Sequence, residues 1–209
     1  MPGRSDRVRV GLTGGIGAGK SLVSVLLAER GAVVIDYDLL AREAVEVGSS
    51  ALADIVERFG MGVLLEDGSL NRPALGEIVF ADEAARRELE AITHPAIGQL
   101  AWARDGAAPE GSIVVHDHPI LVETGLAEFM DVVVVVDAPE DVQVDRLIRL
   151  RRMSEADARA RIAAQSSRDA RLAAADVVID NSGTVEELVP QVDALWVRLR
   201  GEVGVGDPA

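Results

Sequence analysis

The segment GGIGAGKS, from Gly14 to Ser21, decides the fold expected for this chain. It satisfies the pattern GxxxxGK[ST], and it lies between an apolar β-branched run, Val8 to Leu12, and a helix-like segment, Ser21 to Arg30. Glycines let consecutive backbone N–H groups turn toward an anion, and the positive end of the following helix dipole strengthens that attraction. The segment therefore predicts a loop that holds phosphate groups.

Two other kinds of nucleotide site do not fit this segment. The dinucleotide-binding pattern GxGxxG would require glycine at position 20 or 22, where the chain has Lys20 and Leu22. A regulatory GTPase would need a second lysine to read its base, and Lys20 is the only lysine in the chain. A kinase remains, with Lys20 on the β- and γ-phosphates of ATP and the Ser21 hydroxyl on Mg²⁺.

The spacing of apolar runs predicts the fold class. Five short β-branched runs alternate with segments of helix length, a pattern typical of a parallel sheet with helices on both faces. We therefore expect an α/β fold of the P-loop kinase type with a five-stranded parallel sheet. The expected strands are Val8 to Leu12, Val33 to Ile35, Ile113 to Val115, Val132 to Val136, and Val177 to Ile179.

A single domain with two insertions is expected. Its core would comprise residues 7–38, 110–145 and 172–200, with a helical acceptor lobe at 39–109 and an arginine-rich lid at 146–171. Within the lobe, the helical pattern breaks at Gly48, at Asp67 and Gly68, and at His94 and Pro95. A last helix is expected from Val185 to Leu199, and the Gly- and Pro-containing tail at 201–209 is expected to be disordered.

Composition limits the possible partners. The chain has 209 residues, no cysteine and a formal net charge of −14, so we expect no disulfide, no thiolate metal site, and no broad binding to nucleic acid or anionic membranes. Neither the amino terminus, Met1 to Arg9, nor the densest apolar run, Val132 to Val136, resembles a targeting or membrane-spanning segment. A cytoplasmic protein is expected, and the composition leaves its oligomeric state open.

Arginines gather in one stretch of this acidic chain. Between positions 146 and 171 they form a candidate phosphate-binding flap, and the alternative is a solvated helical face paired with Glu155, Asp157 and Asp169. Ser154 is expected to cap a helix that begins at Glu155. The eight arginines are Arg146, Arg149, Arg151, Arg152, Arg159, Arg161, Arg168 and Arg171.

Asp36 and Asp38 are the candidates for the general base, because they follow the second strand at the edge where ligands gather in parallel sheets. They would point the same way if the strand continued through both. One of the two is instead expected to cap the helix that opens near Leu39.

Over Val8 to about Arg200 the sequence resembles the dephospho-CoA kinase family. The resemblance rests on an ordered series of segments rather than on any one of them after the phosphate-binding loop. They are GLTGGIGAGKS at Gly11 to Ser21, VIDYDLLAR at Val34 to Arg42, DGSLNR at Asp67 to Arg72, THP at Thr93 to Pro95, HPILVETGL at His118 to Leu126, ARIAAQSSRDARL at Ala160 to Leu172, and VIDNSG at Val178 to Gly183.

The resemblance implies a reaction and a set of residue roles. ATP would phosphorylate the ribose 3′-hydroxyl of dephospho-CoA, with Lys20, Asp38 and Arg151 as catalytic residues, Asp38 being the base and Arg151 the lid arginine on ATP. Nucleotide contacts would come from Gly14, Gly15, Ile16, Gly17, Ala18, Gly19, Lys20, Ser21, Leu22, Arg151, Asn181 and Gly183. Acceptor contacts would come from Asp38, Arg42, His94, Pro119, Leu121 and Glu123.

Some residues admit a second interpretation. His94 either contacts the acceptor or starts a helix before Pro95. Asp117 is a second-rank ligand, through water, of the Mg²⁺ expected on Ser21, or an acceptor of backbone hydrogen bonds. His116 and His118 share one face of the expected strand and suggest a metal pair, for which the sequence offers no near third ligand.

The chain departs from the family pattern near both expected sites. Leu22 replaces a hydroxyl residue, Tyr37 and His118 replace smaller or aliphatic residues, and Arg152 stands where glycine is common. Two alternatives therefore stay open beside dephospho-CoA phosphorylation. One is another small-molecule or nucleotide kinase, and the other is a nucleotide-binding regulatory protein that has lost turnover.

Overall fold

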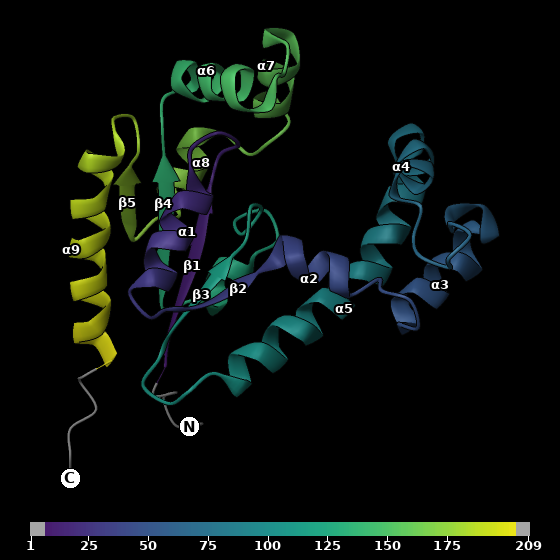
Figure 1. Ribbon diagram of the computed structural model, residues 1–209, viewed down its shortest axis with the longest axis horizontal. Coiled ribbons are helices and arrows are strands. Elements are labelled where there is room, and N and C mark those ends of the chain that lie inside the picture. Colours follow the sequence, from purple (N-terminus) through teal and green to yellow (C-terminus); the bar gives the residue numbers. More distant parts are fainter. Residues whose placement is uncertain (1–6, 204–209) are drawn as a thin grey trace. The chain divides into compact units, whose positions relative to one another are not determined.

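A computed structural model describes residues 7–203 as two compact units (Figure 1). The first unit holds the chain up to Ile35 and again from Ala108, and the second unit comprises Asp36–Ala107. The sheet and the phosphate-binding segment belong to the first unit. The second unit is helical.

The first unit is built on the expected five-stranded sheet. Its strands are β1 (Val8–Gly14), β2 (Val33–Asp36), β3 (Ile113–Asp117), β4 (Val132–Asp137) and β5 (Val177–Asp180). They lie in the order β2-β3-β1-β4-β5, and the β1–β3, β1–β4 and β4–β5 pairs are parallel. The predicted sheet is thus confirmed, and each strand extends slightly beyond its apolar run.

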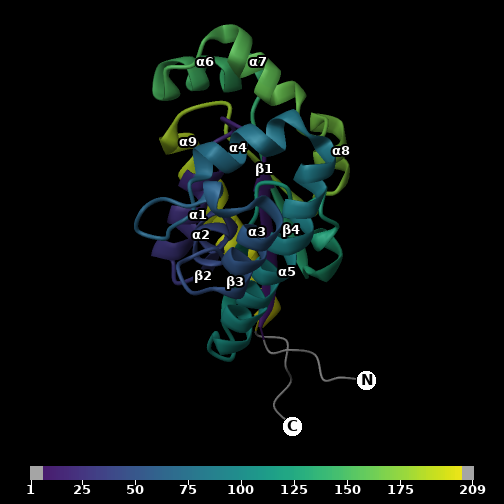
Figure 2. The ribbon, with the colours of Figure 1, turned by 90° about the vertical axis from the view of Figure 1, so that its right-hand side faces the viewer.

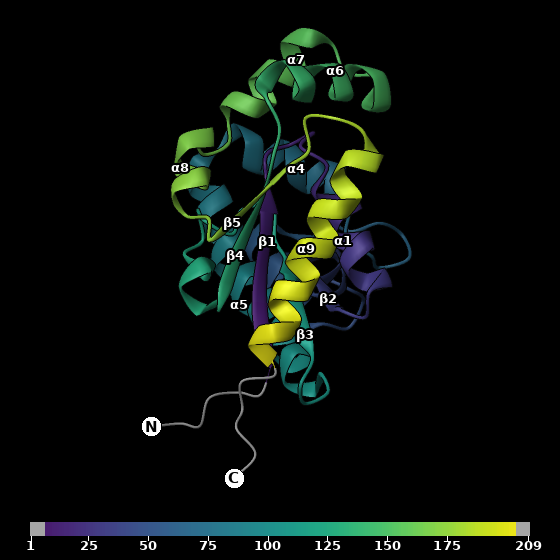
Figure 3. The same ribbon diagram turned by 90° about the vertical axis from the view of Figure 1, so that its left-hand side faces the viewer.

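Alternate residues of β4 show how the sheet is buried on both faces. Val132, Val134 and Val136 pack in a cluster with the helices α1 (Lys20–Glu29) and α9 (Val185–Val203), which lie beside each other on one face (Figure 3). Val133 and Val135 point into a second cluster formed by the segment after β3 and by α8 (Arg168–Ala173). This two-residue period explains why β4 reads as five consecutive valines.

Two further helices follow β4 beyond the carboxyl ends of the strands. These are α6 (Glu140–Arg151) and α7 (Glu155–Ala163), seen at the top of Figures 2 and 3. Ser154 caps α7 by accepting a hydrogen bond from the Asp157 N–H at 3.1 Å, as predicted. The pair packs together through Val144, Leu147 and Ala158.

The second unit consists of helices packed around one long helix. The long helix is α5 (Glu83–Ala107), and α2 (Tyr37–Glu43), α3 (Ser50–Phe59) and α4 (Arg72–Ala81) contact it (Figure 2). A short 3-10 helix, η1 (Met61–Val63), joins α3 to α4, and a second, η2 (Leu126–Phe129), precedes β4 in the first unit.

The expected helix break at His94 and Pro95 is wrong. Both residues lie inside α5, which continues through Pro95. Proline removes one backbone donor from a helix, but packing of neighbouring residues such as Ile92 and Ala96 into the core of the unit keeps the helix continuous. His94 is exposed and starts no helix.

The carboxyl-terminal helix is longer than expected. α9 runs to Val203, so Gly201 to Val203, assigned to the disordered tail, are helical, and the rest of that tail lies outside the described residues. Gly201 and Glu202 are exposed, while Val203 packs against the core cluster of the sheet. Within residues 7–203, no helix is both long enough and apolar enough to span a membrane.

Candidate active site

Residues 14–21, here called the phosphate loop, join β1 to α1 as the motif predicted. Gly17 and Gly19 have φ values of 79° and 94°, a left-handed region in which side chains are strained. The Ala18 N–H donates to the Gly15 carbonyl at 2.9 Å, and α1 begins at Lys20 directly after Gly19. The loop therefore ends at a helix amino terminus, where unpaired N–H groups attract anions.

Two carboxamides hold the phosphate loop in place. The buried Asn181, in the turn after β5, donates from Nδ2 to the Ala18 carbonyl at 2.7 Å. Gln165, between α7 and α8, accepts at Oε1 a hydrogen bond from the Ile16 N–H at 2.8 Å. The loop is thus tied to two segments distant in sequence.

A third contact lies beside Gly15. A side chain at Gly15 would begin 2.9 Å from Nη2 of Arg171 and 3.2 Å from Oε1 of Gln143. Both of these residues are buried, and Gln143 Oε1 is the one buried side-chain oxygen or nitrogen without a hydrogen-bond partner within residues 7–203. Burial lowers the pKa of Arg171, although the charges of Glu123 and Asp137 oppose that change. The loop thus has a tightly packed cationic neighbour.

Lys20 and Asp117 form an ion pair at the carboxyl edge of the sheet. The pairing register places Leu12 of β1 opposite Asp117 of β3, which brings the end of β3 beside the phosphate loop. Ser21 is exposed in the first turn of α1. Of the two residues expected to serve Mg²⁺, Ser21 thus follows Lys20 in α1, and Asp117 at the end of β3 is paired with Lys20.

The lid arginines divide into paired and unpaired side chains. Arg159 pairs with Glu140 and Glu155, and Arg168 makes a two-pronged contact with Asp137 at the end of β4. Arg151, the last residue of α6, is exposed, and its side chain has no hydrogen bond or ion pair with any residue from 7 to 203. Its neighbour Arg152 adopts φ 55°, which fits a position where glycine is common.

The segment after β3 holds three of the predicted acceptor residues. The Pro119 carbonyl accepts from the Thr13 hydroxyl at 3.3 Å, and Leu121 is fully buried in the cluster with Val133. The Glu123 carboxylate accepts hydrogen bonds from the side chain and the N–H of Ser166. Leu121 therefore packs the core in this structure, and Glu123 is tied to the lid.

Ionisation of Glu123 reflects these contacts. Burial acts to raise the pKa of Glu123, but the hydrogen bonds from Ser166 and the charge of Arg171 outweigh it and lower that pKa. Arg171 also donates to the Ser166 carbonyl. Glu123, Ser166 and Arg171 thus form one polar network next to Gln165.

The second unit carries the predicted base. Asp36 caps α2, accepting from the N–H groups of Asp38 at 2.8 Å and Leu39 at 3.1 Å, so it is the capping residue of the pair. Asp38 is exposed in the first turn of α2, and because β2 ends at Asp36 the two carboxylates do not lie on one strand face. Arg42 is exposed in the last turn of the same helix.

Tyr37 lies buried next to Asp38. Burial, with a smaller contribution from the charge of Asp105, raises the pKa of the Tyr37 phenol to about 12. The phenol is therefore neutral at physiological pH. The carboxylate of Asp38 remains the group in this turn that can accept a proton.

The remaining predicted residues have separate surroundings. Gly183 precedes α9, where a side chain would collide with Glu187, and Leu22 packs partly buried against the core cluster of the sheet. His116 is buried in β3, but His118 follows the strand and accepts the Ile120 N–H at 3.2 Å. No three His, Asp or Glu side chains in the described part of the chain are grouped to hold a metal ion.

Sequence reasoning missed the supports of the phosphate loop. No pattern in the sequence marks Gln143, Gln165 is one residue of a longer family segment, and Arg171 is one of eight arginines between positions 146 and 171. A signal existed for the last two, because both lie in ARIAAQSSRDARL. Their roles depend on contacts between segments about 150 residues apart, such as the one between Ile16 and Gln165.

Comparisons with known proteins identify the family of this chain. The dephospho-CoA kinase family matches the chain over residues 8–187. A dephospho-CoA kinase of Streptomyces avermitilis is 55% identical over 192 residues, which are 92% of this chain and 94% of that protein. A protein of Thermus thermophilus with a known crystal structure has 30% sequence identity to this chain and a TM-score of 0.80. The match covers 92% of this chain and 98% of that one.

A more distant structure supports the fold alone. Dephospho-CoA kinase from Campylobacter jejuni is 23% identical with a TM-score of 0.73, and the match covers 94% of this chain and 98% of that one. The family match spans most of the chain, including the phosphate loop, Asp38 and residues 146–171, and the match with the Streptomyces relative covers 92% of the chain. This chain belongs to the dephospho-CoA kinase family.

Proposed function

We propose that this protein transfers the γ-phosphoryl group of ATP to the ribose 3′-hydroxyl of dephospho-CoA, giving coenzyme A and ADP. The observation that carries the proposal is the phosphate loop with Lys20 at its end and Asp117 beside it. Family membership supports this acceptor over those of other small-molecule kinases.

Lys20 would exchange its partner when ATP binds. Its ammonium group contacts Asp117 in this structure, and phosphate oxygens are competing partners of greater charge. The backbone N–H groups of Gly17 and of Gly19 to Ser21 would hold the remaining oxygens, since the Ala18 N–H donates to the Gly15 carbonyl. The protein thus contributes orientation and charge neutralisation, the main sources of rate in phosphoryl transfer.

Mg²⁺ fits the residues around Lys20. Ser21 offers an exposed hydroxyl, and release of Lys20 would free the Asp117 carboxylate, so hard oxygen donors are available for this ion. When bound, Mg²⁺ neutralises charge on the β- and γ-phosphates. Because the described residues provide no group of three metal ligands, phosphate oxygens and water would complete the site.

Asp38 would take the proton from the acceptor hydroxyl. Asp36 is occupied as a helix cap, and the Tyr37 phenol is neutral, which leaves Asp38 with an exposed carboxylate. We assign acceptor contacts to Arg42, His94, the Pro119 backbone and Glu123 in the same proposal, and a packing role to Leu121.

Arg151 would contact ATP from the lid formed by residues 146–171. Its guanidinium is exposed and unpaired within residues 7–203, while neighbouring Arg159 and Arg168 are committed to carboxylates. An arginine held ready in this way can neutralise charge at the transition state, worth ~10³ or more in rate in other P-loop enzymes.

An acceptor panel tests the proposal against its alternatives. The purified full chain is given ATP, Mg²⁺ and one acceptor at a time, and ADP release is measured for dephospho-CoA, shikimate and nucleoside monophosphates. We expect dephospho-CoA to have the highest kcat/KM. Preference for another acceptor would support a different kinase, and ATP binding without turnover on any acceptor would support a regulatory role.

A further inference from the structure

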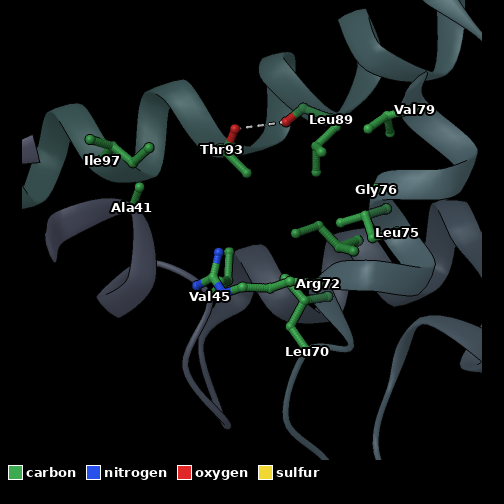
Figure 4. Close-up of a pocket in the computed structure, with 11 residues that line it drawn as sticks. Ala41, Val45, Leu70, Arg72, Leu75, Gly76, Val79, Leu89, Thr93 and Ile97 are labelled. Atoms are coloured by element: carbon green, nitrogen blue, oxygen red, sulfur yellow. Dashed lines mark hydrogen bonds between the residues drawn. The ribbon is translucent and has the colours of Figure 1, made fainter. Parts of the chain in front are cut away.

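The helical unit encloses a pocket of about 260 Å³ between α2, α4 and α5 (Figure 4). Ligand pockets commonly measure ~300–1,000 Å³, so this one has room for part of a ligand such as dephospho-CoA, not for the whole molecule. The residues that line the pocket indicate which part of a ligand it could bind.

The wall is aliphatic apart from two side chains. It is formed mainly by Ala, Val, Ile and Leu residues, among them Ala41 and Val45 of α2 and Leu89 of α5. The Thr93 hydroxyl already donates to the Leu89 carbonyl at 2.9 Å. A purine ring would leave its nitrogens without partners here, so an aliphatic group fits better.

Arg72 is the charged residue of the pocket. It lines the pocket together with Val45 (Figure 4), and its side chain forms no hydrogen bond or ion pair with residues 7–203. Arginine binds phosphate oxygens in two-pronged geometry and is never neutral at physiological pH. The pocket therefore combines an aliphatic wall with a cation suited to a phosphate group.

Gly76 of α4 is one of the residues that line this pocket. It lies inside the helix with no positive φ, and a methyl group there would meet only the Phe80 ring, at 3.7 Å. Neither backbone strain nor crowding therefore requires glycine, although glycine weakens a helix interior relative to alanine. Because Gly76 lines the pocket, a side chain larger than a methyl group at this position would change the wall of the pocket.

The pocket shares a helix with the proposed base. Asp38 and Ala41 are three residues apart in α2, a spacing that places them on neighbouring positions of one helix face. Ala41 lines the pocket. A ligand held there would extend along the side of α2 on which Asp38 lies.

We propose that this pocket receives the branched aliphatic part of the pantetheine arm of dephospho-CoA, with Arg72 binding the adjoining diphosphate. In that molecule a CH₂ group alone separates the diphosphate from the carbon that bears two methyl groups. Arg72 would thus bind the diphosphate, and the aliphatic wall would contact the two methyl groups that follow it in the ligand. The inference rests on the proposed function and assigns its acceptor subsite.

Gly76 variants test the subsite, with Gly98 as the matched control. Gly98 is also a helical glycine of this unit, in α5, and a methyl group there would meet nothing within 4 Å. We measure KM and kcat for dephospho-CoA, together with melting temperature, for Gly76→Ala, Gly76→Leu and Gly98→Ala. ADP-ribose, which shares the adenosine diphosphate but lacks the arm, serves as a comparison acceptor.

The expected result separates lost binding from lost folding. Gly76→Leu should raise KM for dephospho-CoA about tenfold or more, since single groups in apolar pockets change specificity by ~10–200-fold. Its preference for dephospho-CoA over ADP-ribose should fall by a similar factor. Gly76→Ala should shift KM in the same direction while its melting temperature rises, and Gly98→Ala should raise melting temperature with wild-type KM.

Two outcomes would overturn the inference. If the wild type uses dephospho-CoA and both Gly76 variants keep its KM, the subsite is wrong and the proposed function stands. If Gly76→Leu does not fold, Gly76→Ala serves alone, and an unchanged KM for dephospho-CoA in that variant would overturn the subsite. If the wild type does not phosphorylate dephospho-CoA, the proposed function fails, and the subsite fails with it.

Discussion

At the scale of single residues, Lys20 carries the greatest functional weight. It is the only lysine of the chain, it follows the glycine that closes the phosphate loop, and it forms an ion pair with Asp117. No other ammonium group can replace it. An arginine from the lid would bring a different geometry, because guanidinium groups bind in planar, two-pronged arrangements.

Replacing Lys20 tests its role in catalysis. Lys20→Ala should lower kcat/KM for ATP about 100- to 1,000-fold, the usual cost of removing one group that stabilises transition-state charge. The assay is ADP release with dephospho-CoA as acceptor, and circular dichroism checks that the variant is folded. Activity equal to that of the wild type would remove Lys20 from the site.

Asn181 supports the phosphate loop through the hydrogen bond from its side chain to the Ala18 carbonyl, and a substitution at Asn181 can test that contact. Asn181→Ala would remove the donor at 2.7 Å from the buried Ala18 carbonyl and leave it only the longer contact with Arg146 Nη1 at 3.4 Å, at a cost of about 1 kcal/mol. We expect a lower free energy of unfolding and a raised KM for ATP. Asn181→Asp, which places a carboxylate against the same carbonyl, should be worse, and a neutral effect of both changes would show that the contact is dispensable.

At the level of elements, the segment between α7 and α8 is joined to the phosphate loop by a hydrogen bond from the Ile16 N–H to Gln165. The segment from Gln165 to Ser167 joins α7 to α8, holds Ile16 through Gln165, and is itself held by Glu123 through Ser166. Three segments that are remote in sequence thus meet beside the loop. A substitution that breaks the contacts of any one of these segments should therefore change the KM for ATP.

The Glu123 network predicts a pH-dependent contribution to stability. The pKa of Glu123 is lowered from 4.5 by folding, so its contribution is present above pH 4.5 and is lost as pH falls through the lower folded value. Glu123→Gln should therefore cost about 1 kcal/mol at pH 7 and progressively less in acid. Urea unfolding at several pH values measures this difference, and a gap that stays constant in acid would contradict the assignment.

Elements were predictable where local rules decide them. The five strands follow from β-branched runs, and the start of α7 follows from Ser154, whose hydroxyl caps the helix. The break expected at Pro95 was wrong because tertiary packing outweighed the loss of one hydrogen bond. The contacts of Gln165 and Asn181 were out of reach because they join segments whose meeting depends on the whole fold.

For the protein as a whole, a negative net charge is compatible with phosphate binding because positive charge is concentrated in one part of the chain. The chain has a net charge of −14, yet its arginines gather between positions 146 and 171. Arg159 pairs with Glu155, one of the three partners that the alternative interpretation expected, and Arg168 pairs with Asp137 instead. Arg151 does not pair within residues 7–203, and Arg171 is buried next to the phosphate loop. Repulsion of other polyanions can thus coexist with attraction of one triphosphate.

Ligand-induced stabilisation tests this selectivity. ATP with Mg²⁺ at 100 times its Kd should stabilise the folded protein by about 2.7 kcal/mol, which raises the melting temperature of a chain of this size by about 5–10 °C. Duplex DNA at the same phosphate concentration should leave it unchanged. A shift with DNA, or the full ATP shift in Lys20→Ala, would contradict the account.

The fate of the γ-phosphoryl group tests the central claim most directly. The full chain is incubated with Mg²⁺, dephospho-CoA and ATP labelled in its γ-phosphate, and the position of the label in the product is determined by NMR. We expect label on the 3′-oxygen of the adenosine ribose, with coenzyme A and ADP formed in equal amounts. Label found only in free phosphate, or on another oxygen of the acceptor, would contradict it.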